Sequence, residues 1–231
     1  MKRCLGAYMV VLGMVAMATA QDVVIEKESG VYVGARLGIY NIKSKSDVDM
    51  TVTATGNGSI LARDTGTEEI TGNVPGGALF VGYKLSPQFR IEAEVSTFSA
   101  DYTVSWSSTK GTVTTTMLKA LGYWDIPLEN TPIKPYLVVG LGNVNYEDKL
   151  GGWSLTTSGL SFDLGVGCGY TLTENLTLDA SVRYMTAKMA DVTEQENLGN
   201  WGPPFGNVIY QETWKVTLTS LAVNVGIRYI F

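Results

Sequence analysis

The chain has 231 residues and a formal net charge of −5, and only 17% of its residues are charged, whereas about a quarter is usual in a soluble domain. An acidic chain without a basic cluster argues against nucleic acid or another polyanion as a partner. The complete absence of histidine removes the usual general base of a serine nucleophile, so we expect no enzymatic activity.

Residues 1–20 have the pattern of a cleaved secretory signal peptide. Two basic residues precede an apolar stretch at 5–16, and the small residues Ala18 and Ala20 form a cleavage site. The apolar stretch is shorter than the ~20 residues of a transmembrane helix, so we expect cleavage rather than anchoring. The mature chain then carries 15 basic and 22 acidic side chains, a net charge of −7, and one cysteine, Cys168, which cannot form an internal disulfide.

From residue 30 onward, apolar and polar side chains alternate, which is the pattern of β-strands. In segment 160–170 every even position is apolar or aromatic, and every odd position is glycine, serine or aspartate. The same alternation occurs at 89–96, 176–184 and 221–231. The sequence predicts eight strands, at about 30–40, 76–86, 88–104, 112–127, 134–146, 157–171, 175–187 and 214–231.

The polar positions of these strands distinguish a membrane barrel from a soluble β-sandwich. They hold mainly glycine and serine with isolated charges, which suits a crowded lumen with the apolar face toward lipid. Tight connections also alternate with mostly longer ones. We therefore predict an all-β fold, an eight-stranded antiparallel transmembrane up-and-down β-barrel over residues 30–231, in the bacterial outer membrane. A short periplasmic segment at 21–29 precedes it, and both termini face the periplasm.

The long connection 41–75 leaves an alternative open. Gly56-Asn57-Gly58 is a favourable hairpin turn between segments 48–55 and 59–63, whose apolar alternation is weak. We interpret this region as a hairpin that projects above the membrane, and the alternative is a ten-stranded barrel.

An eight-stranded barrel is just wide enough to be filled by side chains, and charges inside it need partners. Counting along each strand from the tight-turn end predicts three cross-strand ion pairs, namely Glu94–Lys119, Asp163–Arg183 and Asp179–Arg228. Arg36 and Glu92 complete the predicted inward set of ion-pairing residues. These charges either plug the interior or gate a narrow polar path.

Other candidate chemistry is weak. Asp191, Glu194 and Glu196 could hold Ca²⁺, but a solvated acidic loop explains them better. The glycine repeat at 165–169 lies in a strand rather than in a strand–turn–helix unit, and Cys168 faces lipid. We expect no metal and no cofactor.

Four stretches carry a resemblance to a known family: Gly82–Glu94, Lys134–Gly142, Leu164–Tyr170 and Val225–Phe231. They resemble the porin-opacity, OmpA-like family of small outer-membrane β-barrels. The resemblance implies insertion by the barrel assembly machinery, which reads the terminal aromatic, here Phe231 with Tyr229 beside it. It also implies a surface antigen, adhesin, invasin or minor porin without shared catalytic residues. The acidic loops of this chain differ from those of heparin-binding members.

The combined prediction is a structural, surface-exposed interaction protein of the surface antigen or adhesin type with a largely plugged lumen. Loops 41–75 and 188–213 would reach an extracellular or host partner. Trp201 and Phe205 form an apolar tip that either contacts this partner or packs on its own loop or on the barrel rim. The alternative is a minor porin or small-solute channel gated by interior salt bridges. We expect a monomer surrounded by outer-membrane lipid.

Overall fold

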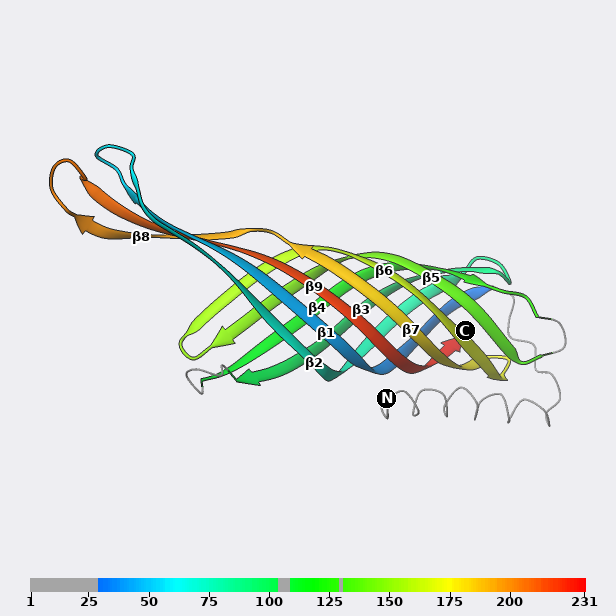
Figure 1. The fold of residues 1–231 in the computed structure, drawn as a ribbon. Coiled ribbons are helices and arrows are strands. Elements are labelled where there is room, and N and C mark those ends of the chain that lie inside the picture. Colours follow the sequence, from blue (N-terminus) through cyan, green and yellow to red (C-terminus); the bar gives the residue numbers. More distant parts are fainter. Residues whose placement is uncertain (1–28, 104–108, 129–130) are drawn as a thin grey trace.

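The computed structural model describes residues 29–103, 109–128 and 131–231, and in these ranges the chain is all-β (Figure 1). The described strands form one antiparallel sheet. Their bounds are β1 Gly30–Ala54, β2 Ile60–Lys84, β3 Phe89–Thr103, β4 Lys110–Asp125, β5 Ile133–Leu150, β6 Trp153–Thr173, β7 Leu176–Met189, β8 Val192–Asn200 and β9 Asn207–Ile230. Within the described part of the chain, no helix is long and apolar enough to cross a membrane.

Eight of these strands form a ring. The sheet runs in the order β1-β2-β3-β4-β5-β6-β7-β9, and β9 also pairs with β1. The β1–β9 register is continuous from Tyr32↔Ile230 to Ala54↔Val208. The predicted eight-stranded antiparallel barrel is therefore confirmed. The residues of the ten-strand alternative instead prolong β1 and β2, so they add no strands to the ring.

Large apolar side chains cover the outside of the ring, where Leu37, Leu79 and Leu160 are 70%, 69% and 78% exposed. Just beyond this apolar band, the outward residues are polar: Asn41, Asn73, Thr97, Thr116, Asn143, Ser158, Thr186 and Thr219. The register pairs Asn41 with Asn73, Thr97 with Thr116, and Thr186 with Thr219, so the band ends at a common level along each of these strand pairs. Such an outer band is the surface that a barrel presents to a bilayer.

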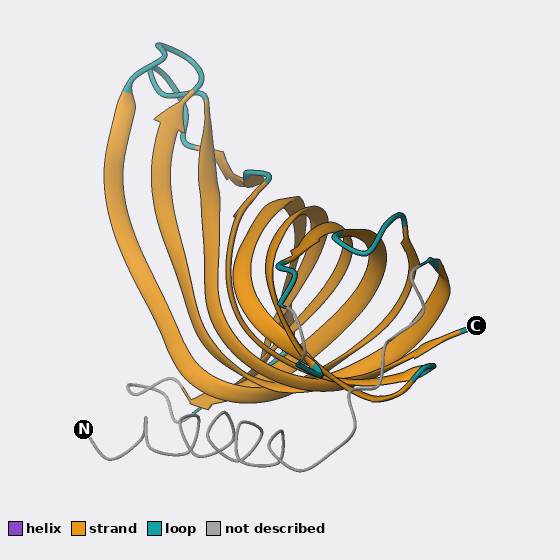
Figure 2. Cartoon of the chain, turned by 90° about the vertical axis from the view of Figure 1, so that its right-hand side faces the viewer, coloured by secondary structure: helices purple, strands orange, loops and turns teal. Residues whose placement is uncertain are grey.

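The strands β1, β2 and β9 continue well beyond the other strands of the ring (Figures 1 and 2). β2 pairs with β3 over Gly76–Lys84, and its residues 60–75 pair with β1. β9 pairs with β7 up to Thr217 and with β8 from Trp214 to Asn207. The result is a four-stranded sheet in the order β2-β1-β9-β8. We call it the projecting sheet, comprising residues 41–73 and 192–219.

The existence of β8 corrects the prediction of a loop at 188–213. Residues Val192–Asn200 form a strand that pairs with the start of β9, which itself begins at Asn207 rather than at 214. Most of β8 is exposed on both faces. Since neither face is buried, its sequence shows little apolar alternation, and the pattern used to find the other strands is missing.

The two hairpin turns of the projecting sheet are joined. The backbone N–H of Thr55 donates to the carbonyl of Asn207 at 2.8 Å, and that of Gly56 donates to the carbonyl of Phe205 at 2.7 Å. A Cβ atom at Gly56 would lie 2.5 Å from the carbonyl oxygen of Pro204, so this close approach requires glycine. The β1–β2 and β8–β9 turns therefore form one tip.

Candidate functional site

The interior of the ring carries the charges. All eight residues of the predicted inward set are buried, with 1–5% of their surface exposed: Arg36, Glu92, Glu94, Lys119, Asp163, Asp179, Arg183 and Arg228. Lys84, Arg90 and Asp125 are also buried but were missing from that set. Arg90 lies two residues before Glu92 on β3, so the period-two alternation already contained the signal that places it inside.

A central network joins charges from three strands, β1, β3 and β7, with a tyrosine from β4. Arg36 Nη1 lies 2.5 Å from Glu92 Oε1 and 2.6 Å from Glu94 Oε2. Arg183 Nη1 lies 2.9 Å from the same Glu94 oxygen. The hydroxyl of Tyr123 accepts from Arg183 and donates to Glu92 at 2.9 Å, which links the two ends of the network. Each carboxylate is thus held by more than one donor, as a buried charge requires.

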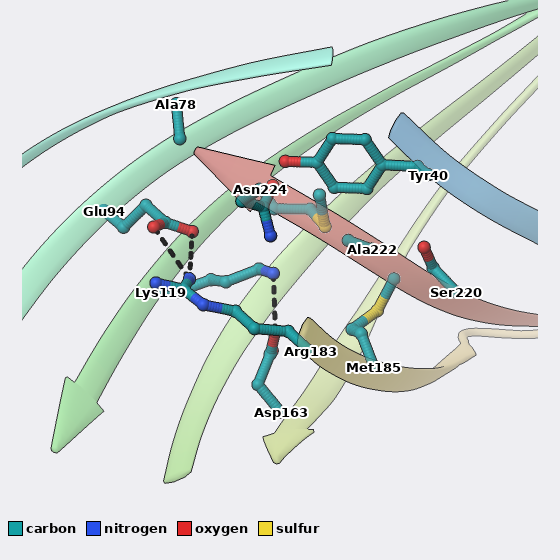
Figure 3. Close-up of a pocket in the computed structure, with 11 residues that line it drawn as sticks. Tyr40, Ala78, Glu94, Lys119, Asp163, Arg183, Met185, Ser220, Ala222 and Asn224 are labelled. Atoms are coloured by element: carbon teal, nitrogen blue, oxygen red, sulfur yellow. Dashed lines mark hydrogen bonds and ion pairs between the residues drawn. The ribbon is translucent and has the colours of Figure 1, made fainter. Parts of the chain in front are cut away.

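The observed partners correct two of the predicted pairs. Glu94 and Lys119 are directly opposite on β3 and β4, as expected. Lys119 nevertheless donates to Asp163 at 2.7 Å, while Glu94 accepts from Arg183 (Figure 3). The ring is narrow enough for long side chains to meet across the lumen, so strand adjacency does not decide the pairing. The third predicted pair, Asp179–Arg228, stays a prediction. Asp179 accepts from the Tyr136 hydroxyl at 2.5 Å and lies 3.9 Å from Arg36 Nε, and Arg228 lies 5.4 Å from the ring centroid of Tyr32.

Arg90 forms a second layer closer to the tight-turn end. Its Nε donates to both carboxylate oxygens of Asp125 at 3.1 Å. The guanidinium carbon lies 3.9 Å from the ring centroid of Tyr123 and 4.7 Å from that of Tyr136. Stacking on two aromatic faces compensates part of the desolvation cost of this cation.

An apolar layer covers the charged network on the side of the projecting sheet. Its buried members are Tyr40, Ile42, Val74, Phe98, Ala100, Val113, Met117, Val144, Tyr146, Leu155, Met185, Ala187, Met189, Val216, Leu218 and Ala222. A cavity of about 10 Å³ lies where this layer meets Glu94, Lys119, Asp163 and Arg183 (Figure 3). That volume holds about one water molecule. Side chains therefore fill the lumen at this level.

The outward face of the projecting sheet is polar and carries three ion pairs among the described residues. Lys43 Nζ lies 2.7 Å from Glu69, and Arg63 Nη2 lies 2.7 Å from Asp49. The hydrogen bond from Arg63 holds the pKa of Asp49 below its ordinary value. This face has the character of an ordinary water-exposed surface.

The remaining predicted site residues lie at the two ends of the molecule. Trp201 and Phe205 are in the tip and are 58% and 36% exposed. Phe231 is 63% exposed at the opposite end, and its ring lies 5.2 Å from that of Tyr229. The proposed roles of these residues in partner contact and assembly stay predictions.

The described residues contain no cluster of three or more metal-ligating side chains. Glu194 and Glu196 lie on β8, a strand rather than the predicted loop. Cys168 is half-buried on β6.

An antiparallel ring with an apolar outer band and a charged interior defines a transmembrane β-barrel of the outer-membrane class. The outer membrane protein beta-barrel domain family matches residues 8–231. The chain therefore belongs to this family, which is found in the bacterial outer membrane. No curated protein matches the chain in sequence.

Several solved structures are similar to the chain. Neisserial surface protein A is 18% identical with a TM-score of 0.48, and the match covers 89% of this chain and 100% of that one. OprG from Pseudomonas aeruginosa is 15% identical with a TM-score of 0.49, covering 88% and 98%. Ail of Yersinia pestis is 16% identical with a TM-score of 0.40, covering 83% and 99%.

Proposed function

We propose that this protein is a surface-exposed interaction protein, of the surface antigen or adhesin type, with a lumen that does not conduct. The observation that carries the proposal is the projecting sheet, which extends the barrel far beyond its apolar band. In this proposal residues 1–20 are a cleaved signal peptide and both termini lie in the periplasm. The projecting sheet then stands outside the cell.

The edges of the projecting sheet support a role in binding. In the described part of the chain, β8 pairs on one side, with β9, and residues 60–75 of β2 pair on one side, with β1. Both segments are exposed along most of their length. Unpaired strand edges present backbone N–H and C=O groups that can accept another strand, whose side chains then provide specificity.

The filled lumen favours this function over a minor porin. A conducting path would have to pass both the apolar layer and the Arg36–Glu94–Arg183 network. Breaking such a buried network costs several kcal/mol, about 3–5 per unpaired partner. Refolded residues 21–231 should therefore show no conductance steps above background in planar bilayers. Reproducible steps would overturn the non-conducting lumen and favour the porin.

The orientation can be tested on intact cells by cysteine labelling. The background variant Cys168→Ser removes the mature chain's own thiol. A Gln195→Cys variant in β8 should react with a membrane-impermeant maleimide in intact cells. The matched variant Glu174→Cys, in the tight β6–β7 turn, should react only after the outer membrane is opened. The reverse pattern would contradict the proposed orientation.

The interaction role can be tested by deleting residues 190–209, which removes β8 and the start of β9. Bacteria that display the deletion variant should adhere less to epithelial monolayers than bacteria with the full chain. The heat-modifiable gel migration of the barrel should stay unchanged. Equal adhesion by both strains would contradict the adhesin role, and loss of the migration shift would show that the segment is needed for folding.

A further inference from the structure

A second cavity opens at the mouth of the barrel, at the foot of the projecting sheet. It has a volume of about 160 Å³ and is lined by Ser46, Glu68, Ile70, Tyr102, Asp148, Leu150, Leu155 and Trp214. We call it the mouth pocket. Its lining comes from six strands, β1, β2, β3, β5, β6 and β9, so the framework of the barrel builds it rather than any one loop.

The mouth pocket has one sign of charge. Glu68 and Asp148 line it, and no basic side chain does so among the described residues. The acidic neighbours of these two residues point the other way and are neutralised. Lys43 lies 2.7 Å from Glu69, and Lys149 lies 2.8 Å from Glu147. The acidic side chains on the outer face are therefore paired with lysines, whereas the two in the mouth pocket face no basic side chain of its described lining.

Among the described residues, Asp148 has no basic side chain beside it in the lining of the mouth pocket. Its carboxylate is half-buried and accepts a hydrogen bond from the Tyr102 hydroxyl at 2.7 Å. Burial raises the pKa of Asp148 above its ordinary value, the Tyr102 hydrogen bond opposes that shift, and the charge of Glu68 adds to it. A cation placed between the two carboxylates would relieve both the burial cost and the repulsion.

Two aromatic side chains complete the walls. Tyr102 and Trp214 are partly buried and pack against the apolar layer of the lumen, which holds them in place. An ammonium group within about 6 Å of a tryptophan or tyrosine ring is attracted to its face, most strongly where water is partly excluded. Drug-sized ligands need pockets of about 300–1,000 Å³. The mouth pocket, at about 160 Å³, instead suits one small cationic group.

We propose that the mouth pocket binds an organic ammonium group, with Glu68 and Asp148 supplying the charge and Tyr102 and Trp214 the aromatic walls. The ammonium belongs either to a lysine side chain of a partner docked on the projecting sheet or to a free small amine. The site requires neither the strand edges nor the tip, and it shares with the proposed function only the outward orientation of the mouth.

Calorimetric titration of refolded residues 21–231 in detergent micelles tests the site. The probes are tetramethylammonium chloride and Nα-acetyl-lysine methylamide, with sodium chloride of equal ionic strength as the reference. The test variant combines Glu68→Gln with Asp148→Asn, which keeps side-chain shape and removes both charges. The control combines Glu69→Gln with Glu147→Gln, which changes net charge equally on the opposite face.

We expect saturable binding that weakens about tenfold in the Glu68/Asp148 variant and less than about twofold in the Glu69/Glu147 control. Trp214→Leu should weaken binding about fivefold. Equal weakening in both double variants, or no saturable binding of either probe, would overturn the site. Binding of the lysine analogue assigns the pocket to a partner's side chain, and binding of tetramethylammonium alone assigns it to free amines. Heat-modifiable migration checks folding, and maleimide labelling of the Gln195→Cys variant tests the proposed orientation independently.

Discussion

The membrane-level part of the ring and the projecting part use the same strands with opposite polarity. In β1, Leu37 and Ile39 point outward into the apolar band, and Arg36 is buried in the lumen. A few residues further along, Lys43 and Lys45 are outside and Ile42 is buried. Residues continue to alternate between inward and outward positions along the strand. At membrane level the apolar residues point outward, and in the projecting part, where water replaces lipid outside, they point inward.

β9 repeats this switch. Val223 and Val225 belong to the exposed apolar set, whereas Val216 and Leu218 are buried in the apolar layer. Below the switch, the interior is held by ion pairs and hydrogen bonds, because the lipid outside gives burial of apolar surface no advantage. Above it, the interior is held by the hydrophobic effect, as in a water-soluble protein. Matched substitutions in the two parts should therefore have different consequences.

The largest difference should come from breaking one ion pair in each part. Arg36→Met leaves Glu92 and Glu94 short of a buried partner, so we expect a loss of about 3–5 kcal/mol in the free energy of unfolding. Lys43→Met breaks a pair whose side chains are about half exposed, and at most about 1 kcal/mol should be lost. Urea unfolding in lipid vesicles measures both, and similar values would contradict the distinction.

The next largest effect concerns the outer surface. Leu164→Arg places a charge in the middle of the apolar band of β6 and should destabilise the barrel by about 2–4 kcal/mol. Thr156→Arg, on the same face of the same strand beyond the band, should cost about 0–1 kcal/mol. The same unfolding measurement applies. A large loss in the free energy of unfolding for Thr156→Arg would show that the membrane extends further toward the projecting sheet than the apolar band indicates.

The apolar layer should respond as a soluble core does. Leu218 is fully buried, and Leu218→Ala should cost about 2–3 kcal/mol through lost burial and a new cavity. Leu198→Ala, on the exposed strand β8, should cost less than about 1 kcal/mol. Planar-bilayer recording of the Leu218 variant adds a second measurement. Conductance steps in this variant would show that the apolar layer blocks ion flow through the lumen.

The smallest effect should occur in the exposed pair of the projecting sheet. Arg63→Gln should raise the pKa of Asp49 toward its ordinary value, as followed by the carboxyl resonance in an NMR titration. Because folding lowers this pKa, any stabilisation is present above the unfolded value and is lost as the pH falls through the folded value. At an exposed site we expect no measurable change in unfolding. An unshifted Asp49 titration would show that the pair does not persist.

The sequence predicted the ring because strands that face lipid carry apolar residues at every outward position, alternating with small or charged residues inside. It predicted the projecting hairpin at 48–63 but missed β8, where residues such as Thr193 and Gln195 are polar on both faces. A strand that buries neither face depends on backbone pairing, and backbone pairing leaves little signal in side-chain polarity.

For the lumen, the alternation of inward and outward residues along each strand identified which charges point inward but could not identify their partners. The Lys119–Asp163 and Glu94–Arg183 contacts depend on how far side chains reach across the ring, and strand order does not contain that distance. The apolar layer was missed for another reason. Ile42 and Leu218 lie where the outward residues have become polar, so the inward set reverses character without any interruption of the pattern.

The joined tip has an immunological consequence. Thr55 and Gly56 are hydrogen-bonded to Asn207 and Phe205, respectively. Thr55 and Asn207 are 152 positions apart in the sequence. An antibody raised against this tip would recognise a discontinuous epitope that exists only in the folded chain. Linear peptides from either turn would be poor immunogens for it, and a vaccine antigen based on this region would have to present both hairpins together.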